Sequence, residues 1–326
     1  MSEHSLRPGG APAVELVGIN KTFENVNAVS SLDLRIPAGS TYGLLGPNGA
    51  GKTTTIRMIL RIIDADSGAI NLFGQPMSQN SLDRIGYLPE ERGIYKNMKL
   101  KRLLSFFAEL KGMPARVSRP KIVDWLERFE LGDRADAKIK ELSKGNQQKV
   151  QFISAILHEP EVMIFDEPFT GLDPINQQVL KDIIVDLKRA GKTIIFSTHI
   201  IEHAERICDH VCIIDKGKKV ADGTVSQVKT EHGGDYIAIS FVEWSANAVA
   251  MVKRSSVVGR VRENGTTLEV GMKDKADPQE LLRELVSAGV RIRRFECTEP
   301  SLEQIFLERV GASEEIITEM RAAHHV

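Results

Sequence analysis

One glycine-rich loop restricts the fold of this chain more than any other feature. The loop reads Gly46-Pro47-Asn48-Gly49-Ala50-Gly51-Lys52-Thr53, which matches the pattern G-x-x-x-x-G-K-[S/T], and Thr54 follows it. An apolar run at residues 41–45 precedes the loop and helical periodicity at residues 53–60 follows it, so the loop joins a predicted strand to a predicted helix. Glycines let successive backbone N–H groups converge on phosphates, and a helix N-terminus adds the positive end of its dipole. We expect Lys52 to reach the β- and γ-phosphates of a nucleotide and Thr53 to offer its hydroxyl to Mg²⁺.

A pair of carboxylates follows a second apolar run. The run at residues 162–165 is short enough for a buried strand, and Asp166 and Glu167 come directly after it. Ligands collect at the carboxyl ends of strands in a doubly wound sheet. We therefore assign Asp166 to the metal and Glu167 to the polarisation of water. The alternative is that the two residues are only a solvated strand end.

The rest of the chain predicts an α/β domain with insertions. Two early segments with apolar alternation predict an antiparallel start, residues 99–158 have a helical pattern, and the later strands and helices alternate as in a parallel sheet. The expected strands are residues 14–20, 31–36, 162–165, 193–197 and 211–214, with helices at 174–190 and 200–207.

Glycines between residues 222 and 234 interrupt this pattern, and the order β-α-β-β-α-β that follows predicts a small ferredoxin-like module. We expect a flexible N-terminus at residues 1–12, a large domain at 13–225 with a helical subdomain at about 93–160, a C-terminal α+β domain at 235–312 and a tail at 313–326.

Further short motifs produce a resemblance to a known family. Ser143 and Gly145 open a predicted helix and alone indicate an ordinary N-cap. Together with the loop and the carboxylates, the run Leu142-Ser143-Lys144-Gly145-Asn146-Gln147-Gln148 resembles the signature motif of ABC ATPases, although Lys144 and Asn146 depart from the usual Leu-Ser-Gly-Gly-Gln. His199, at the end of Ser197-Thr198-His199, resembles the switch histidine of that family, and Gly171-Leu172-Asp173 resembles its D-loop. Phe23 occupies the place of the aromatic residue that stacks on adenine, but a core phenylalanine would look the same.

The resemblance implies a P-loop NTPase fold of the ABC cassette type, with a mixed-sheet core, an antiparallel subdomain and a helical subdomain. It implies ATP and Mg²⁺ as cofactors and a homodimer in which each chain completes the site of the other. The implied catalytic residues are Glu167, His199 and Lys52. The implied nucleotide-binding residues are Phe23, Gly46, Pro47, Asn48, Gly49, Ala50, Gly51, Lys52, Thr53 and Thr54, with Ser143, Gly145, Gln147 and Asp173 acting in trans. The implied Mg²⁺ ligands are Thr53, Asp166 and Glu90.

Glu90 is a departure from the family pattern. Members usually have a glutamine that touches Mg²⁺ and the membrane domains, whereas this chain reads Tyr87-Leu88-Pro89-Glu90-Glu91-Arg92-Gly93-Ile94-Tyr95. A carboxylate binds Mg²⁺ at least as well as an amide, so the change is compatible with function. Glu90 is the expected equivalent of that glutamine, and Glu91 is the alternative.

The same Pro-Glu-Glu-Arg-Gly stretch, with Pro300-Ser301-Leu302-Glu303-Gln304-Ile305-Phe306-Leu307, is similar to ABC-2 type exporters such as sodium-efflux and drug-efflux ATPases. The second stretch also predicts an amphipathic helix capped by Ser301 that buries Leu302, Ile305 and Phe306. The two interpretations are compatible.

Composition separates the remaining function classes. The chain has 43 Lys+Arg against 44 Asp+Glu, so it has no overall basic field that would attract nucleic acid. No apolar stretch reaches the ~18 residues of a membrane span, and the first residues lack the apolar core of a signal peptide. Three cysteines fit a reducing compartment. We expect a cytoplasmic ATPase at the inner face of the membrane, bound to a separate permease.

There are two alternative functions. A soluble ABC ATPase acting on ribosomes or DNA would usually have two cassettes or a coiled-coil insertion together with basic surfaces. A regulatory module that binds ATP without hydrolysis is disfavoured because Glu167 and His199 are both present.

Overall fold

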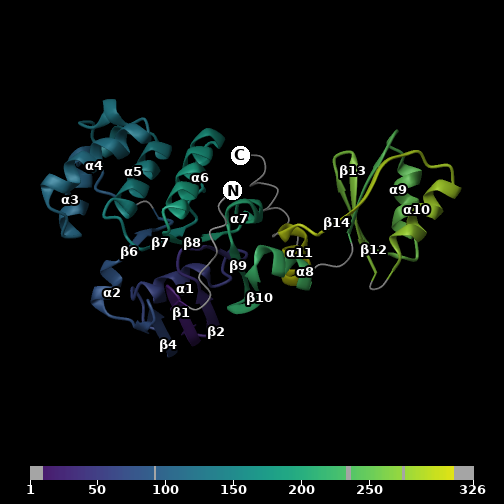
Figure 1. The fold of residues 1–326 in the computed structure, drawn as a ribbon, viewed down its shortest axis with the longest axis horizontal. Coiled ribbons are helices and arrows are strands. Elements are labelled where there is room, and N and C mark those ends of the chain that lie inside the picture. Colours follow the sequence, from purple (N-terminus) through teal and green to yellow (C-terminus); the bar gives the residue numbers. More distant parts are fainter. Residues whose placement is uncertain (1–9, 92, 233–235, 274–275, 312–326) are drawn as a thin grey trace. The chain divides into compact units, whose positions relative to one another are not determined.

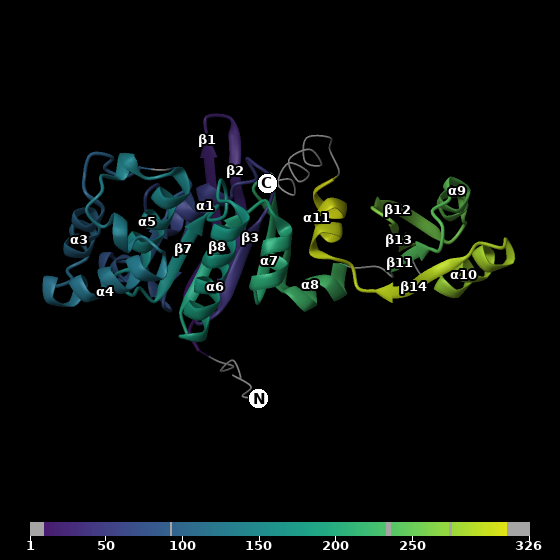
Figure 2. The same cartoon turned by 90° about the horizontal axis from the view of Figure 1, so that it is seen from above.

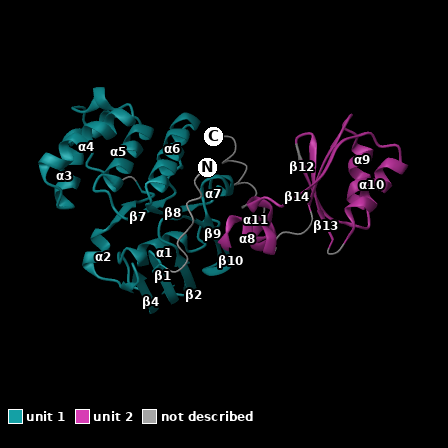
Figure 3. Cartoon of the chain, viewed as in Figure 1, with its two compact units in different colours: residues 1–222, 312–326 teal, residues 223–311 magenta. Residues whose placement is uncertain are grey.

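The computed structural model describes residues 10–91, 93–232, 236–273 and 276–311. Most of the predicted N-terminus, Arg92 and the predicted tail lie outside these residues. The chain forms two compact units, one ending at residue 222 and one spanning residues 223–311 (Figure 3).

A six-stranded sheet forms the centre of the first unit. Its strand order is β10-β9-β3-β8-β7-β6, and the neighbours from β9 to β6 are parallel. The central strands are buried along their whole length because helices cover both faces, which is typical of parallel sheets. The strands are β3 (Thr41–Leu45), β6 (Ile85–Leu88), β7 (Val162–Asp166), β8 (Thr193–Thr198), β9 (His210–Asp215) and β10 (Lys218–Thr224).

A second, four-stranded antiparallel sheet packs against the other side of helix α1 (Lys52–Ile59). Its order is β2-β1-β4-β5. Ile56, Met58 and Ile59 of α1 share one apolar core with residues of both sheets. Figure 1 shows α1 beside strands β1 and β2 of this layer. The strands are β1 (Val14–Phe23), β2 (Val26–Ile36), β4 (Ser67–Leu72) and β5 (Gln75–Pro76). This layer fixes α1, and with it the glycine-rich loop, against the central sheet.

The predicted helical subdomain is present as a group of three helices (Figure 2). They are α3 (Leu100–Leu110), α4 (Ala115–Arg128) and α5 (Lys144–Ile156), with short 3-10 turns at Gly132–Arg134 and Ile139–Glu141. Helices α6 (Pro174–Arg189) and α7 (Ile201–Ile207) pack on the central sheet, and α2 (Gln79–Asp83) precedes β6. None of the helices in the described ranges is long and apolar enough to cross a bilayer.

The second unit contains the predicted ferredoxin-like module. Its elements follow the order β-α-β-β-α-β, and its antiparallel sheet has the order β12-β13-β11-β14. They are β11 (Tyr236–Phe241), α9 (Ala246–Arg254), β12 (Val258–Asn264), β13 (Thr267–Met272), α10 (Pro278–Ser287) and β14 (Ile292–Thr298). Apolar residues of the sheet, α9 and α10 form a separate core.

Two further helices, α8 (Val225–His232) and α11 (Leu302–Val310), pack on each other in the second unit. Ser301 caps α11 through a capping box, and Leu302, Ile305 and Phe306 are buried, as the amphipathic pattern predicts.

Several elements differ from the sequence-based expectation. β2 begins at Val26 rather than at residue 31. Its first residues pair with the end of β1 in a largely exposed hairpin, so they show no regular alternation of apolar and polar residues. β4, β6, α2 and β10 were not predicted, and β6 is too short for a periodic signal. Asp222 and Gly223, expected to break the pattern, lie within β10, and helix α8 follows where a break was expected.

Candidate nucleotide-binding site

The glycine-rich loop has room for glycine only at two of its positions. A Cβ atom on Gly46 would lie 2.4 Å from the carbonyl oxygen of Ile214. Gly51 has a φ of +107°, and a Cβ atom there would lie 2.4 Å from the carbonyl oxygen of Ala28. The loop can therefore pass close to neighbouring backbone and turn directly into α1, whose first N–H groups have no side-chain cap. Such a helix start is suited to bind phosphate.

Lys52 is folded back into the loop. Its Nζ donates to the carbonyl oxygen of Gly46 at 2.8 Å and to that of Pro47 at 3.2 Å. The side chain also lies 3.7 Å from Oε1 of Glu167, and both side chains are almost fully buried. Lys52 therefore occupies the cradle into which phosphates are predicted to bind.

One open hollow of about 490 Å³ surrounds the loop. It brings together the loop, the β1–β2 hairpin and the predicted residues Glu90, Glu167 and His199, which come from distant parts of the sequence. Its lining consists of Val26, Ala28, Asn48, Gly49, Ala50, Gly51, Lys52, Thr53, Thr54, Glu90, Glu167, Thr170 and His199.

Asp166 ends β7 with one carboxylate oxygen engaged and one without a partner. Oδ1 accepts hydrogen bonds from Ser197 and, at 3.2 Å, from Thr53. Oδ2 is buried and has no hydrogen-bond partner among the described residues. An unpaired buried carboxylate oxygen is costly unless a cation binds it. Thr53 and Asp166 therefore fit the predicted Mg²⁺ site, since hydroxyl and carboxylate oxygens are ligands that this ion prefers.

Glu167 adopts a left-handed backbone conformation with φ of +49°. Its Oε1 lies 3.0 Å from Nδ1 of His199, and its backbone N–H donates to Oγ of Ser197 at 3.0 Å. Left-handed conformations are uncommon for residues with a Cβ atom and cluster at functional sites. The turn directs the carboxylate of Glu167 toward both Lys52 and His199.

The charges of the site favour a bound cation. Burial raises the pKa of Asp166, and burial together with the carboxylates of Asp166 and Glu167 raises the pKa of Glu90. Burial lowers the pKa of Lys52, although the three carboxylates oppose this shift. One lysine thus faces three carboxyl groups, an excess of negative charge that a divalent cation would relieve.

Glu90, rather than Glu91, borders this site. Both residues are exposed, but Glu90 lines the hollow around the loop, whereas Glu91 is absent from the lining among the described residues. The backbone carbonyl of Glu91 instead accepts a bond from Gln151 at 3.4 Å.

A small cavity of about 140 Å³ beside the carboxylates contains residues that the sequence did not single out. Its lining is Leu88, Pro89, Glu90, Gln148, Gln151, Asp166, Glu167 and Thr170. Gln148 donates to the carbonyl oxygen of Pro168 at 2.6 Å. In the sequence, Gln148 ends the signature-like run and Gln151 is an ordinary polar position on the same helix, and neither has an assigned role. The packing of α5 beside β7 places them near the carboxylates.

The residues predicted to act in trans lie elsewhere. Ser143 caps α5 by accepting from the N–H of Asn146 at 3.2 Å, and Asp173 caps α6 by accepting from that of Asn176 at 3.0 Å. A Cβ atom on Gly145 would lie 3.6 Å from the side chain of Asn176, so the two helix starts are neighbours. Gln147 turns back to the carbonyl of Leu142. Among the residues that the structure describes, none of these four lines the hollow around the loop.

Phe23 lies at the end of β1 and is 45% exposed. It pairs with Val26, which lines the hollow, but Phe23 itself is not in the described lining. Lys21 lies over its ring at 5.3 Å. The ring is accessible near the edge of the hollow, and adenine stacking stays a prediction.

Comparisons with known proteins agree with this architecture. The family model described as "ABC transporter" matches residues 29–170, and the model described as "ATP-binding protein DrrA1-3-like, C-terminal domain" matches residues 223–310. The chain is 43% identical to the uncharacterized ABC transporter ATP-binding protein YhaQ of Bacillus subtilis, over 90% of this chain and 97% of that protein.

Two relatives have more specific names. The chain is 34% identical to the Nod factor export ATP-binding protein I of Rhizobium sp. over 92% of this chain and 97% of that protein. It is 30% identical to the daunorubicin resistance ATP-binding protein DrrA3 of Streptomyces coeruleorubidus, over 92% and 96%.

A solved structure described as an ATP binding subunit of an ABC transporter superposes with a TM-score of 0.63 at 30% identity, covering 67% of this chain and 92% of that one. The described site and these similarities identify the chain as a member of the ABC transporter ATP-binding proteins, which hydrolyse ATP.

Proposed function

We propose that this chain is the ATPase subunit of an exporter and that it drives a separate membrane permease from the inner face of the membrane. The observation that carries this proposal is the C-terminal unit, which matches the DrrA1-3-like model over residues 223–310. Two relatives that align along nearly the whole chain are named for Nod factor export and for daunorubicin resistance. The daunorubicin-resistance relative supports the drug-efflux class. The sodium-efflux class rests on the sequence resemblance alone, and in either case the cargo belongs to the permease.

The proposed hydrolysis uses groups that line the hollow around the loop, together with Asp166, which lines the small cavity beside it. Glu167 orients and deprotonates the attacking water, and His199, 3.0 Å away, holds the Glu167 carboxylate in position and supports the γ-phosphate. Lys52 leaves the carbonyls of Gly46 and Pro47 to bind the phosphates. Thr53, Asp166 and Glu90 would hold Mg²⁺, which when bound neutralises charge on the β- and γ-phosphate oxygens.

We further propose a homodimer in which the second chain completes each site. Ser143, Gly145, Gln147 and Asp173 gather at the starts of α5 and α6, outside the described lining of the hollow. Residues on such a separate surface can complete the nucleotide site of another copy. A two-fold axis satisfies both sites at once and is the commonest symmetry of oligomers.

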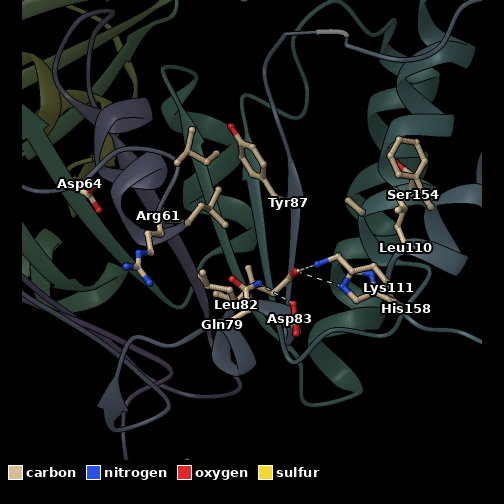
Figure 4. Close-up of a pocket in the computed structure, with 15 residues that line it drawn as sticks. Arg61, Asp64, Gln79, Leu82, Asp83, Tyr87, Leu110, Lys111, Ser154 and His158 are labelled. Atoms are coloured by element: carbon tan, nitrogen blue, oxygen red, sulfur yellow. Dashed lines mark hydrogen bonds between the residues drawn. The ribbon is translucent and has the colours of Figure 1, made fainter.

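A groove of about 710 Å³ is the proposed contact with the permease. It lies between the central sheet and the helical subdomain, with residues from the segment after α1, from α2 and β6, and from the ends of α3 and α5 and the residues that follow them (Figure 4). Ile62 and Leu110 both line it and are 56% and 65% exposed, so the groove offers two large apolar side chains to a partner. β6 leads from the groove into the Glu90 loop, so a segment of the permease bound there would lie one short strand away from the nucleotide site.

Two polar side chains form the floor of the groove. Lys111 and His158 both contact the carbonyl oxygen of Ile85 at 3.3 Å (Figure 4). Burial lowers the pKa of His158 to about 4, so this side chain is neutral at physiological pH. A permease segment that binds here would meet apolar side chains, the charged side chains of Arg61, Asp64, Asp83 and Lys111, and an imidazole without charge.

Affinity capture tests the proposal. The Glu167→Gln chain is tagged and isolated from its native membrane with ATP and Mg²⁺, because blocked hydrolysis should retain the closed dimer on its partner. We expect to recover a polytopic membrane protein together with untagged copies of the chain. Recovery of ribosomes or DNA, or of no membrane protein, would overturn the exporter assignment. Lys52→Met is the matched control. This variant should not bind ATP, so it should not form the closed dimer that stays bound to the partner.

A further inference from the structure

Ser197 connects both members of the carboxylate pair through one hydroxyl group. β8 lies beside β7 in parallel register, which places Ser197 opposite Asp166. The hydroxyl donates to Oδ1 of Asp166 and accepts the backbone N–H of Glu167 at 3.0 Å. Ser197 has no exposed surface. Its single donor and one of its acceptor positions are therefore used within the proposed catalytic site.

The bond to Asp166 determines which carboxylate oxygen is available. Oδ1 is held by Ser197 and by Thr53, whereas Oδ2 is buried without a hydrogen-bond partner in the described part of the chain. Rotation of the carboxylate would break the bond to Ser197. Ser197 thus keeps Oδ2 as the oxygen that a cation can reach.

The bond to Glu167 acts on the backbone. Glu167 has a φ of +49°, a conformation that a residue with a Cβ atom adopts only when its surroundings impose it. Its N–H would otherwise be a buried donor at the end of β7, and Ser197 supplies the acceptor. In this conformation the carboxylate reaches His199 at 3.0 Å and Lys52 at 3.7 Å.

We propose that Ser197 is a positioning residue of the ATPase site, which orients Asp166 toward the cation and holds Glu167 in the conformation required to activate water. The inference rests on the roles proposed above for Asp166 and Glu167. A purely structural serine would only satisfy buried groups. The two roles differ in one measurable respect: positioning affects the response to Mg²⁺ and the rate of the chemical step, whereas a structural role affects folding and all nucleotide binding.

The test compares Ser197→Ala with Ser40→Ala in the full-length chain. Ser40 is a matched control because it is also buried, and its hydroxyl donates to the carbonyl oxygen of Pro37 at 2.7 Å, away from the site. The affinity for a fluorescent ATP analogue is measured with EDTA and with Mg²⁺, followed by kcat and KM. We expect Ser197→Ala to bind the analogue normally in EDTA, while its Mg²⁺ affinity and kcat fall by about 10- to 100-fold, the usual cost of losing a group that orients a metal ligand. Ser40→Ala should match the wild type in all of these.

Two results would overturn the inference. One is a Mg²⁺ response and kcat in Ser197→Ala equal to those of Ser40→Ala. The other is a loss of analogue binding in EDTA as large as the loss measured with Mg²⁺, which would show a structural role. Asp166→Asn is measured in parallel to separate this inference from the proposed function. If Asp166→Asn loses the Mg²⁺ response and Ser197→Ala keeps it, only the role of Ser197 fails. If Asp166→Asn keeps the response, the proposed metal site fails and the inference fails with it.

Discussion

Nδ1 of His199 lies 3.0 Å from Oε1 of Glu167, although 32 positions of sequence separate the two residues. The imidazole therefore contacts the carboxylate that is proposed to activate water, and this contact predicts different effects for the two residues. Glu167→Gln keeps the size and one hydrogen-bond acceptor of the side chain but removes the base.

We expect Glu167→Gln to lower kcat by about 100- to 10,000-fold, the usual contribution of a general base, with ATP affinity preserved. His199→Ala should lower kcat less, because Glu167 then loses its position but not its basicity. For both variants, phosphate release measures the rate of hydrolysis, and equilibrium binding of a fluorescent ATP analogue measures the affinity. Equal loss of binding and hydrolysis in Glu167→Gln would contradict a role confined to chemistry.

Glu90→Gln should stabilise the nucleotide-free chain at neutral and alkaline pH. Burial and the neighbouring carboxylates raise the pKa of Glu90, so the folded state binds a proton more tightly than the unfolded state does. The cost of the ionised side chain is present above the folded pKa and disappears as the pH falls below it. Because Glu90 is partly exposed, the gain should be about 0.5 kcal/mol or less. Thermal melting at pH 8 and pH 4 checks this, with exposed Glu91→Gln as the control. If Glu90→Gln raises the melting temperature equally at both pH values, repulsion between ionised carboxylates is not the cause of the gain in stability.

Gly51→Ala should abolish phosphate binding as well as destabilise the fold. Its φ of +107° and the 2.4 Å approach to the carbonyl oxygen of Ala28 leave no room for a methyl group, so the loop must shift. Backbone strain alone costs about 1–3 kcal/mol. Gly112→Ala is the control, because Gly112 also has a positive φ but no atom within 4 Å of the added Cβ. If both variants lose the same stability and Gly51→Ala still binds ATP, steric closure of the loop is not the reason for this glycine.

Complementation between two inactive variants tests the shared sites. In a mixed dimer of Lys52→Met and Ser143→Arg, one site carries both changes and the other carries neither. If residues of one chain complete the site of the other, mixing should restore up to about a quarter of the wild-type rate, since half of the dimers are mixed and each has one intact site. Co-expressed and separately purified proteins are compared by ATP hydrolysis. If mixed dimers form but ATP hydrolysis does not return, the two chains do not complete each other's sites.

Phe306→Ala should destabilise the C-terminal unit while leaving ATP affinity nearly unchanged. Phe306 is buried in the second unit, on helix α11, which packs on α8, and truncation of such a side chain costs about 3–5 kcal/mol. Proteolysis of the C-terminal unit and ATP binding are measured on the same sample. Val286→Ala, at a position that is 60% exposed, serves as the control. A large loss of ATP affinity in Phe306→Ala would show that the two units depend on each other.

Local patterns in the sequence were sufficient for the elements that carry the glycine-rich loop and the carboxylate pair. The loop from Gly46 to Thr53 has a spacing that few structures tolerate, and the apolar run before Asp166 predicts a buried strand. The order β-α-β-β-α-β of the C-terminal unit could also be predicted, because alternating strands and an amphipathic helix have distinct periodicities. Short or polar elements such as β6 and α8 have no such periodicity, so their existence depended on tertiary packing.

The relations between these motifs were decided by the tertiary structure alone. The sequence favoured Glu90 over Glu91 only through the family resemblance, and the path of the chain after β6 brings Glu90 into the lining of the hollow. Gln148 and Ser197 lie within short motifs of the sequence, but neither could be assigned a role, since a helix glutamine and a strand serine are common residues whose roles depend on their neighbours. Strand pairing selects those neighbours across long stretches of sequence: the pairing of β7 with β8 brings Ser197 to Asp166. The sequence by itself thus determined the chemical groups of the site, whereas the sheet determined their distances, because side-chain contacts between strands depend on register and no local pattern specifies register across such separations.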